Sequence, residues 1–397
     1  MTETWADRSA RILEPLAYEE PYGQADPGRS GLDCVSSPSL RAGGPRERVD
    51  IPLAELTTLG LGGPARRLLE AHSEKQVLEA VAAVDAAGEP LLVIAGGSNL
   101  VIADAGFDGT VLRILTRGVA VKDGGDRVEL VAAAGEPWAD LVSRCVADGL
   151  AGIECLAGIP GLVGATPIQN VGAYGQQVAD TIVSVRTYDR KARAVVVLTG
   201  AQCVFAYRTS RLRRCTRYVV LGVSFGLERS AVGRPVGYAQ LARALGIELG
   251  DRPPLLAVHD AVLALRRRKG MVIDPCDPDS RSAGSFFLNP VLSPEEFLAF
   301  ERRVTRRLGD QVRPPAWPEA DGCVKTSAAW LIERAGFHRG YGEGRVGISS
   351  KHTLALVNRG GATTAELLIL ARELRGGVLE AFGLRLEPEP TLVGAAL

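Results

Sequence analysis

Hydrophobic positions spaced for one helix face are the clearest pattern in the chain. The first set predicts a helix that begins after Ser73 and ends at Gly88. Ser73 and Gln76 together match the pattern of a capping box. Further helices are predicted before Gly149, over 255–268, and after three start signals. These signals are Ser293 with Glu296, Ser327 and Thr364.

Runs rich in β-branched residues predict strands between these helices. LLVIA at 91–95 follows the first helix directly, and a Gly-Gly-Ser-Asn turn separates it from LVIAD. Other strands are predicted over 128–134, 181–189, 193–199 and 217–225, and LRLEPEPTLVG reads as a strand returning at the end of the chain. Residues 1–49 contain many Gly and Pro residues and no apolar period, so they predict a flexible extension outside the fold.

Composition narrows the possible ligands and the compartment. With 397 residues, 46% hydrophobic content and zero formal net charge, the chain can bury a core but lacks the basic surface typical of nucleic-acid or acidic-membrane binding. Its 7 cysteines form no CxxC pair and its 4 histidines form no close pair, which predicts reduced thiols and no metal site. The polar N-terminus lacks a signal-peptide core, so a cytoplasmic protein with a small-molecule ligand is expected.

The segment GIPGLVGATPIQNVGAYG at 158–175 is the most informative stretch. It is uncharged, and its glycines and prolines interrupt a run that would otherwise be core. Glycine lets main-chain N–H groups approach a ligand, so the segment suits a large flat cofactor that carries phosphates. Taken alone, a buried loop without a ligand is the more common reading.

Two short motifs imitate functional sites. Gly60, Gly62 and Ala65 match a GxGxxA dinucleotide fingerprint, but no strand-turn-helix pattern surrounds them. Gly222, Ser224 and Gly226 match the GxSxG elbow of hydrolases, which requires a helix next. The following LERSAVGRP is not helical, so Ser224 is interpreted as an ordinary strand-end residue.

Several segments together carry a family resemblance over residues 50–397. They are AGGSNLVIAD at 95–104, the glycine segment, FAYRTS at 205–210, AGSFFLNP at 283–290 and LEPE at 386–389. In this order they resemble the flavin-dependent UDP-N-acetylenolpyruvoylglucosamine reductases, also called UDP-N-acetylmuramate dehydrogenases, of bacterial peptidoglycan synthesis. The resemblance implies an α+β fold in which a two-lobed FAD-binding region of the vanillyl-alcohol oxidase type precedes a smaller α+β substrate-binding domain. The implied parts are lobes at 50–115 and 116–270, a substrate domain at 271–383 and a tail at 384–397.

The resemblance also implies FAD as cofactor and NADPH as hydride donor. The implied FAD-binding residues are Gly96, Gly97, Ser98, Asn99, Gly164, Ala165, Thr166, Gln169 and Gly172. Main-chain N–H groups and the Ser98 hydroxyl would reach the pyrophosphate, and the later glycines would surround the isoalloxazine. Without the resemblance, Asn99 and Gln169 are equally well read as amides that stabilise turns.

The implied reaction reduces an enolpyruvyl ether, and it needs a cation near the carboxylate and a proton donor to C2. Arg208, Ser285 and Glu389 match the family's catalytic arginine, serine and glutamate. The alternatives are a strand-end charge for Arg208, a turn hydroxyl for Ser285, and Glu387 as the acid, since alternate strand residues share a face. Pro390 removes a strand N–H next to Glu389 and could displace it.

Tyr207, Tyr238, Lys269 and Asn289 resemble the residues that bind the UDP-sugar substrate. Complementing the helix dipole explains at least two of the four charges at the end of the 255–268 helix, so Lys269 alone among them is taken as a possible ligand. A monomer without nucleic-acid or membrane partners is expected. Two rival functions stay open: a flavin-dependent oxidase of the same superfamily, and an inactive protein that binds flavin or UDP-sugar.

Overall fold

The computed structural model describes residues 44–319 and 322–397, so most of the predicted N-terminal extension lies outside the described residues. The exclusion of residues 1–49 from the fold is wrong for its last part. Strand β1 (Arg46–Pro52) pairs antiparallel with β2 (Pro64–Ala71), from Arg46 opposite Glu70 onward. Most β1 side chains are exposed, so main-chain hydrogen bonds hold this edge strand in place. For the same reason the sequence of β1 shows no alternation of apolar residues that would predict a strand.

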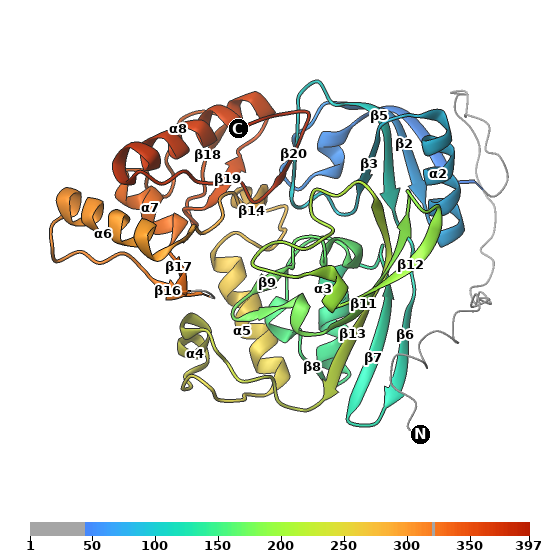
Figure 1. The fold of residues 1–397 in the computed structure, drawn as a ribbon, viewed down its shortest axis with the longest axis horizontal. Coiled ribbons are helices and arrows are strands. Elements are labelled where there is room, and N and C mark those ends of the chain that lie inside the picture. The colour runs from blue at the N-terminus through green and yellow to red at the C-terminus, as the bar shows by residue number, and fades with distance from the viewer. Residues whose placement is uncertain (1–43, 320–321) are drawn as a thin grey trace. The chain divides into compact units, whose positions relative to one another are not determined.

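The first sheet is a small α/β unit (Figure 1). Its order is β1-β2-β5-β3, and β2, β5 (Phe107–Ile114) and β3 (Leu91–Ile94) are parallel. Helix α2 (Glu74–Ala87) connects β2 to β3 and begins after Ser73, whose side chain accepts a hydrogen bond from the Gln76 N–H. The predicted capping box is incomplete, because the Gln76 side chain accepts from His72 N instead of Ser73 N.

The second sheet is antiparallel, with strand order β12-β11-β13-β7-β6 and the short β8 at the end of β13. The strands are β6 (Val119–Gly124), β7 (Arg127–Ala133), β8 (Leu150–Ala151), β11 (Ile182–Asp189), β12 (Ala194–Thr199) and β13 (Tyr218–Arg229). Helices α3 (Trp138–Ala147), α4 (Ala239–Leu245) and α5 (Leu255–Arg268) belong to this part of the chain. As predicted, the apolar stripe of α3 is buried, with Trp138 fully inaccessible.

Ser224 lies in the middle of β13, not at its end. It faces Ser184 on β11 and Val131 on β7, and the strand continues to Arg229. A nucleophile elbow requires a sharp turn from strand to helix immediately around the serine. The GxSxG match therefore has no elbow geometry.

In its described residues, the third part combines two small sheets with three α-helices. The sheets are β14 (Ser282–Ser285), β19 (Ala355–Asn358) and β18 (Val346–Ile348), and β15 (Val291–Leu292), β17 (Val324–Lys325) and β16 (Trp317–Pro318). The predicted helix starts are confirmed in α6 (Pro294–Leu308), with its Ser293–Glu296 capping box, and in α7 (Ala328–Arg334). Helix α8 (Thr364–Phe382) also begins where expected, with Thr363 as its cap.

The predicted returning strand is β20 (Thr391–Val393), which pairs in parallel with β4 (Leu100–Ile102) of the first part. This pairing brings the end of the chain back beside the turn that follows β3. Further hydrogen bonds join α8 to the same region: the Asp104 carboxylate accepts from Thr364 N at 2.7 Å and from Ala365 N at 2.9 Å. The third part is thus attached to the first by hydrogen bonds as well as by packing.

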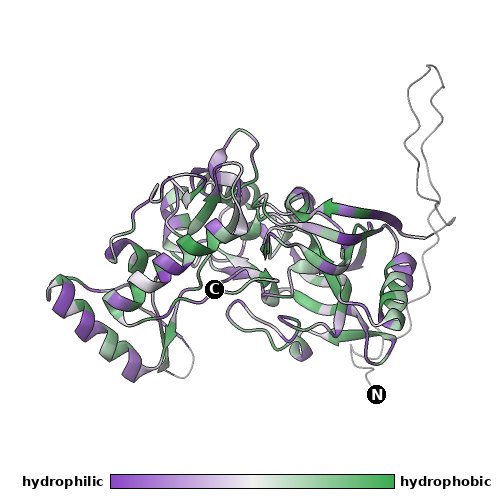
Figure 2. Cartoon of the chain, turned by 90° about the horizontal axis from the view of Figure 1, so that it is seen from above, coloured by the Kyte–Doolittle hydropathy of each residue, from purple (hydrophilic) through white to green (hydrophobic). Residues whose placement is uncertain are grey.

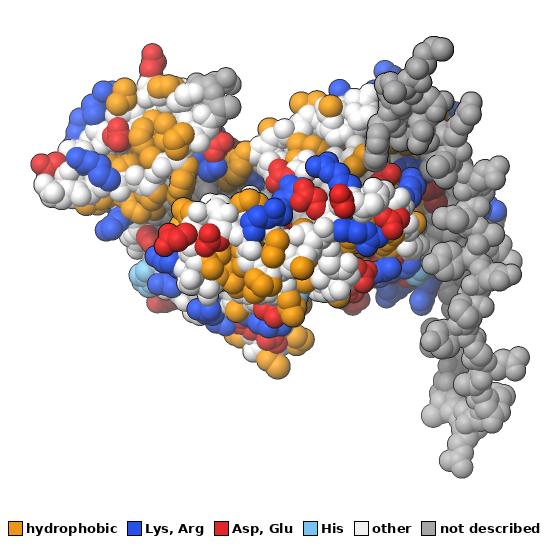
Figure 3. Space-filling view, turned by 90° about the horizontal axis from the view of Figure 1, so that it is seen from below, with side chains coloured by type: hydrophobic (Ala, Val, Ile, Leu, Met, Phe, Trp, Pro, Cys, Tyr) orange, Lys and Arg blue, Asp and Glu red, His pale blue; other side chains and the backbone are white. Residues whose placement is uncertain are grey.

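Hydrophobic residues gather in the sheets, whereas the outer helices alternate between polar and apolar faces (Figure 2). One core runs through the first and second parts, a smaller one lies in the first, and a third fills the third part and reaches Val101 of the first. The domain boundaries at 115 and 270 therefore remain predictions. On the face shown in Figure 3, basic and acidic side chains are intermixed. Across the described ranges, every helix is too short or too polar to cross a bilayer.

We expect Asp104→Ala to destabilise the protein by about 1–2 kcal/mol, because two N–H groups at the start of α8 lose their acceptor. Urea denaturation would measure the change. Asp108→Ala is the matched control, since the Asp108 side chain is 94% exposed. Equal stability of the two variants would contradict this role of Asp104.

Candidate active site

The turn between β3 and β4 and the glycine segment meet with almost no space between their backbones. A Cβ atom on Gly96 would lie 2.9 Å from the Gly161 Cα, and one on Gly97, whose φ is +61°, would lie 1.8 Å from the Leu56 carbonyl oxygen. The Ser98 hydroxyl donates to the Pro160 carbonyl at 3.1 Å. Glycine is required here because a side chain at Gly96 would separate the two segments and one at Gly97 would collide with the Leu56 backbone.

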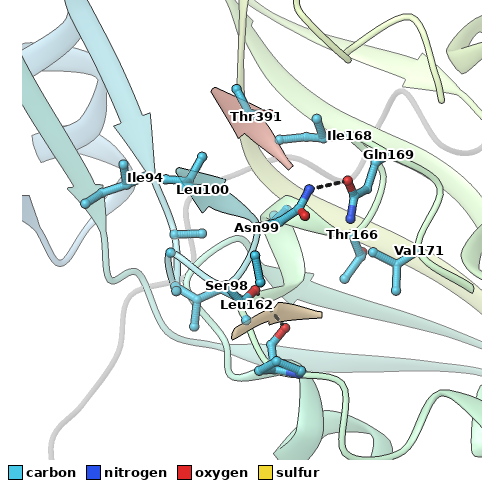
Figure 4. Close-up of a pocket in the computed structure, with 18 of the residues that line it drawn as sticks. Ile94, Ser98, Asn99, Leu100, Leu162, Thr166, Ile168, Gln169, Val171 and Thr391 are labelled. Atoms are coloured by element: carbon cyan, nitrogen blue, oxygen red, sulfur yellow. Dashed lines mark hydrogen bonds between the residues drawn. The ribbon is translucent and has the colours of Figure 1, made fainter. Parts of the chain in front are cut away.

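These two segments line a cavity of about 590 Å³. The Asn99 amide donates to the Gln169 side chain across it (Figure 4). Every residue assigned to FAD from the sequence lines this cavity: Gly96, Gly97, Ser98, Asn99, Gly164, Ala165, Thr166, Gln169 and Gly172. Because the Ser98 hydroxyl already donates to Pro160, main-chain N–H groups are the better donors to a phosphate there.

Arg208, Ser285 and Glu389 line the same cavity although they come from three distant segments. Ser285 ends β14, Arg208 lies in the loop between β12 and β13, and Glu389 precedes β20. The Arg208 Nε lies 3.3 Å from the Glu389 Oε1, and its Nη2 donates to the Gly172 carbonyl at 2.6 Å. One arginine thus connects the acid to the glycine segment.

The two acids of LEPE point to different environments. The Glu387 side chain is 59% exposed and pairs with Arg385, whereas the Glu389 side chain is 14% exposed and faces the cavity. The tail is not a regular strand at this point, so the two acids do not share a face. Burial raises the pKa of the Glu389 carboxyl, while Arg208 and Arg213 lower it.

Pro390 does not displace Glu389. The Glu389 N–H donates to the Phe286 carbonyl at 2.9 Å, and the Thr391 N–H donates to the Asn99 carbonyl at 3.0 Å. The proline stands between these bonds, where the tail changes partners from the third part to β4. The residue without an N–H therefore lies between the two hydrogen-bonded residues, Glu389 and Thr391.

The cavity wall is rich in arginines, and Arg208 is the one among them that the sequence predicted as a site residue. The sequence does not single out Arg266 as a site residue, but the residue is only 9% exposed and its guanidinium donates to the Met271 carbonyl at 2.7 Å. Burial lowers its pKa to about 10, so it stays charged at neutral pH. In the described part of the chain, Glu389 is the sole carboxylate on the cavity wall, which also carries Arg190, Arg208, Arg213, Arg214 and Arg266.

The residues assigned to the substrate lie outside the cavity wall, in two groups. Tyr238 stacks edge-on against Tyr174 at 5.4 Å, and Lys269 lies 5.2 Å from the same Tyr174 ring. The Lys325 Nζ lies 4.8 Å from the centre of the Tyr207 ring. The Asn289 side chain accepts a hydrogen bond from the Ala328 N–H at 3.0 Å. The sequence did not indicate that the Tyr174 ring contacts both Tyr238 and Lys269.

The first of these groups contains buried and half-buried cationic side chains. Burial and then Arg266 lower the pKa of Lys269. Burial, and then the charges of Lys269, Arg266 and Arg339, together lower the pKa of His352 to about 4. A neutral histidine among buried cations indicates a place where an anion would be stabilised.

The cavity fits FAD on its own features. Its volume is that of a small-molecule site, its walls are mainly apolar, bare glycine backbones form one end, and arginines supply charge for a diphosphate. In the residues that the structure describes, no cluster of His, Cys, Asp or Glu could hold a metal ion. The combination defines the class of flavoprotein oxidoreductases.

Comparison with known proteins agrees with this class. Residues 65–197 match the family described as FAD binding domain, and residues 275–393 match UDP-N-acetylenolpyruvoylglucosamine reductase, C-terminal domain. The UDP-N-acetylenolpyruvoylglucosamine reductase of Thermobifida fusca is 58% identical over 88% of this chain and 98% of its own length. That of Streptomyces coelicolor is 57% identical over 91% and 94%.

A solved structure extends the likeness to the fold. The crystal structure of UDP-N-acetylenolpyruvylglucosamine reductase from Thermus caldophilus has a TM-score of 0.59 and 25% identity, and the match covers 88% of this chain and 100% of that chain. The chain therefore belongs to the UDP-N-acetylenolpyruvoylglucosamine reductase family of FAD-dependent enzymes. The resemblance and the fold predicted from the sequence are confirmed.

Gly96→Ala should lower the FAD content of the purified protein about tenfold or more, because its Cβ would push the β3–β4 turn away from Gly161. The ratio of flavin to protein absorbance measures this. Gly376→Ala, whose Cβ meets nothing within 4 Å, is the control and should keep the wild-type ratio. Full flavin content in Gly96→Ala would show that the close approach is unnecessary.

Proposed function

We propose that the protein reduces the enolpyruvyl ether of UDP-N-acetylglucosamine enolpyruvate to UDP-N-acetylmuramate with NADPH, as a step of peptidoglycan precursor synthesis. The observation that carries this proposal is the meeting of Arg208, Ser285 and Glu389 at the cavity lined by the glycine segments. FAD, when bound, supplies hydride transfer between NADPH and the substrate. The protein's own residues supply charge and a proton.

Each of the three residues has a role that follows from its chemistry. The Arg208 guanidinium stabilises negative charge that develops at the substrate carboxylate. The Ser285 hydroxyl delivers a proton to C2, and the nearby enolate makes this transfer favourable. Glu389, beside Arg208 at 3.3 Å, polarises the substrate and assists proton delivery.

The basic group around Lys269 is assigned to the UDP diphosphate. Arg266 repels Lys269, and neither forms an ion pair with a carboxylate of the described residues, so an anionic ligand would relieve their repulsion. Tyr238, which is 42% exposed, can cover the ligand from the start of α4, and Tyr207 and Asn289 bind the sugar side. A monomer in the cytoplasm, where NADPH and UDP-sugars are available, completes the proposal.

The domain assignments belong to the same proposal. Residues 50–115 and 116–270 form the two FAD-binding lobes, 271–383 cover the UDP-sugar, and 384–397 return Glu389 to the cavity. This arrangement is supported by β20, which carries the tail back to β4. An oxidase of the same superfamily would have no enol for Ser285 to protonate, and an inactive binding protein would have no need of it.

Ser285→Ala should abolish reoxidation of the reduced flavin by the enolpyruvyl substrate, by about 10²-fold or more, because the proton donor is lost. Reduction of the flavin by NADPH should be retained. Anaerobic stopped-flow absorbance at flavin wavelengths separates the two half-reactions. Ser224→Ala is the control and should behave as wild type. Reoxidation of Ser285→Ala at the wild-type rate would refute the role of Ser285, and loss of activity in Ser224→Ala would revive a hydrolase.

Glu389→Gln should lower turnover about 10²-fold without lowering stability. The folded pKa of Glu389 is raised, so the carboxyl stabilises the fold fully only below its unfolded pKa. That contribution is lost as the pH rises through the folded value. The stability of Glu389→Gln relative to wild type should therefore be greater at pH 7 than at pH 4, as measured by urea denaturation. Glu387→Gln should change neither property.

A further inference from the structure

Arg213 makes two hydrogen bonds that connect the proposed catalytic residues. Its Nη1 donates to the carbonyl of Arg208 at 2.7 Å, and its Nη2 donates to the carbonyl of Glu389 at 3.2 Å. These carbonyls belong to segments far apart in the chain. The planar guanidinium, with its donors in a fixed fork, therefore sets the distance between the two backbones.

Arg208 needs such support because its backbone is in the left-handed region, with φ of +52°. A residue with a Cβ is disfavoured there, and it stays only where the surroundings hold it. The Arg213 bond holds the Arg208 carbonyl, and the bond from Arg208 Nη2 to the Gly172 carbonyl holds its side chain. With both ends fixed, the Arg208 Nε faces the Glu389 carboxylate.

The Glu389 backbone is fixed in a similar way. Its N–H donates to the Phe286 carbonyl, next to Ser285, and its own carbonyl accepts from Arg213 and, at 3.5 Å, from the Asn99 amide. The Phe286 bond fixes the acid relative to the serine. The Arg213 bond fixes it relative to Arg208.

We propose that Arg213 is a positioning residue for the reduction: its fork aligns Arg208 with Glu389, and its charge acts on the Glu389 carboxyl. This inference rests on the proposed function. It assigns Arg213 no contact with the reacting atoms. A lysine at this position would keep the charge but could not hold two carbonyls with a rigid fork.

The charge of Arg213 has a separate, measurable effect. The charged and titratable groups that interact with Glu389 are Arg208, Arg213 and Tyr207. Arg213 lowers the pKa of Glu389, so removing its charge raises that pKa. The limb of the pH–rate profile that reports Glu389 then moves to higher pH, whichever protonation state is active.

Two variants separate the fork from the charge. Arg213→Lys should lower kcat by about 10²-fold, the scale of a misplacement of about 1 Å, with the pH limb near its wild-type position. Arg213→Gln should lower kcat at least as much and also move the limb to higher pH. Arg211→Lys, an exposed neighbour away from the cavity wall, is the control and should match wild type.

The measurements are steady-state rates from pH 5 to 9, flavin content, and the rate of flavin reduction by NADPH. Retained flavin, retained reduction and the predicted split between the two variants would support the inference. Wild-type kcat in Arg213→Lys, an unmoved limb in Arg213→Gln, or loss of flavin from both variants would overturn it, the last by assigning Arg213 to cofactor retention. If wild-type enzyme itself fails to reduce the enolpyruvyl substrate, the proposed function fails instead.

Discussion

The fixed backbone of Glu389 is the constraint on which the site depends. Its N–H is held by Phe286 of the third part, and its carbonyl by Arg213 of the second part and Asn99 of the first. A buried carboxyl beside an arginine is useful only in one orientation, because electrostatic effects at short range change steeply with distance. All parts of the fold therefore contribute to placing one side chain, and no single element could do so alone.

The charge balance of the cavity indicates which ligands the Glu389 side chain would meet there. The cavity wall carries several arginines against a single carboxylate among the described residues, and burial lowers the hydration of the Arg266 charge in particular. Such a wall favours ligands that bring several negative charges, as FAD and a UDP-sugar do. The zero net charge of the whole chain conceals this local excess, because acidic and basic side chains mix on the surface.

Local signals in the sequence predicted the local structure well. Ser73, Ser293 and Ser327 cap helices as expected, and the α3 stripe faces the core, because these patterns act within one element. The edge strand β1 was missed since its stability lies in main-chain pairing. The burial of Arg266 and the bridge made by Arg213 were also missed, because each depends on carbonyls outside its own element or motif. The glycine segments were predicted because backbones that approach this closely require glycine, and a cluster of glycines is visible in the sequence.

The pairing of β20 with β4 joins the C-terminal segment to a strand that lies far earlier in the chain. Because ribosomes make proteins from the N-terminus, the glycine cradle emerges long before Glu389 does. On the proposed mechanism the acid is therefore the last part of the site to be made, and it reaches its position only when the final strand pairs beside a turn made nearly three hundred residues earlier.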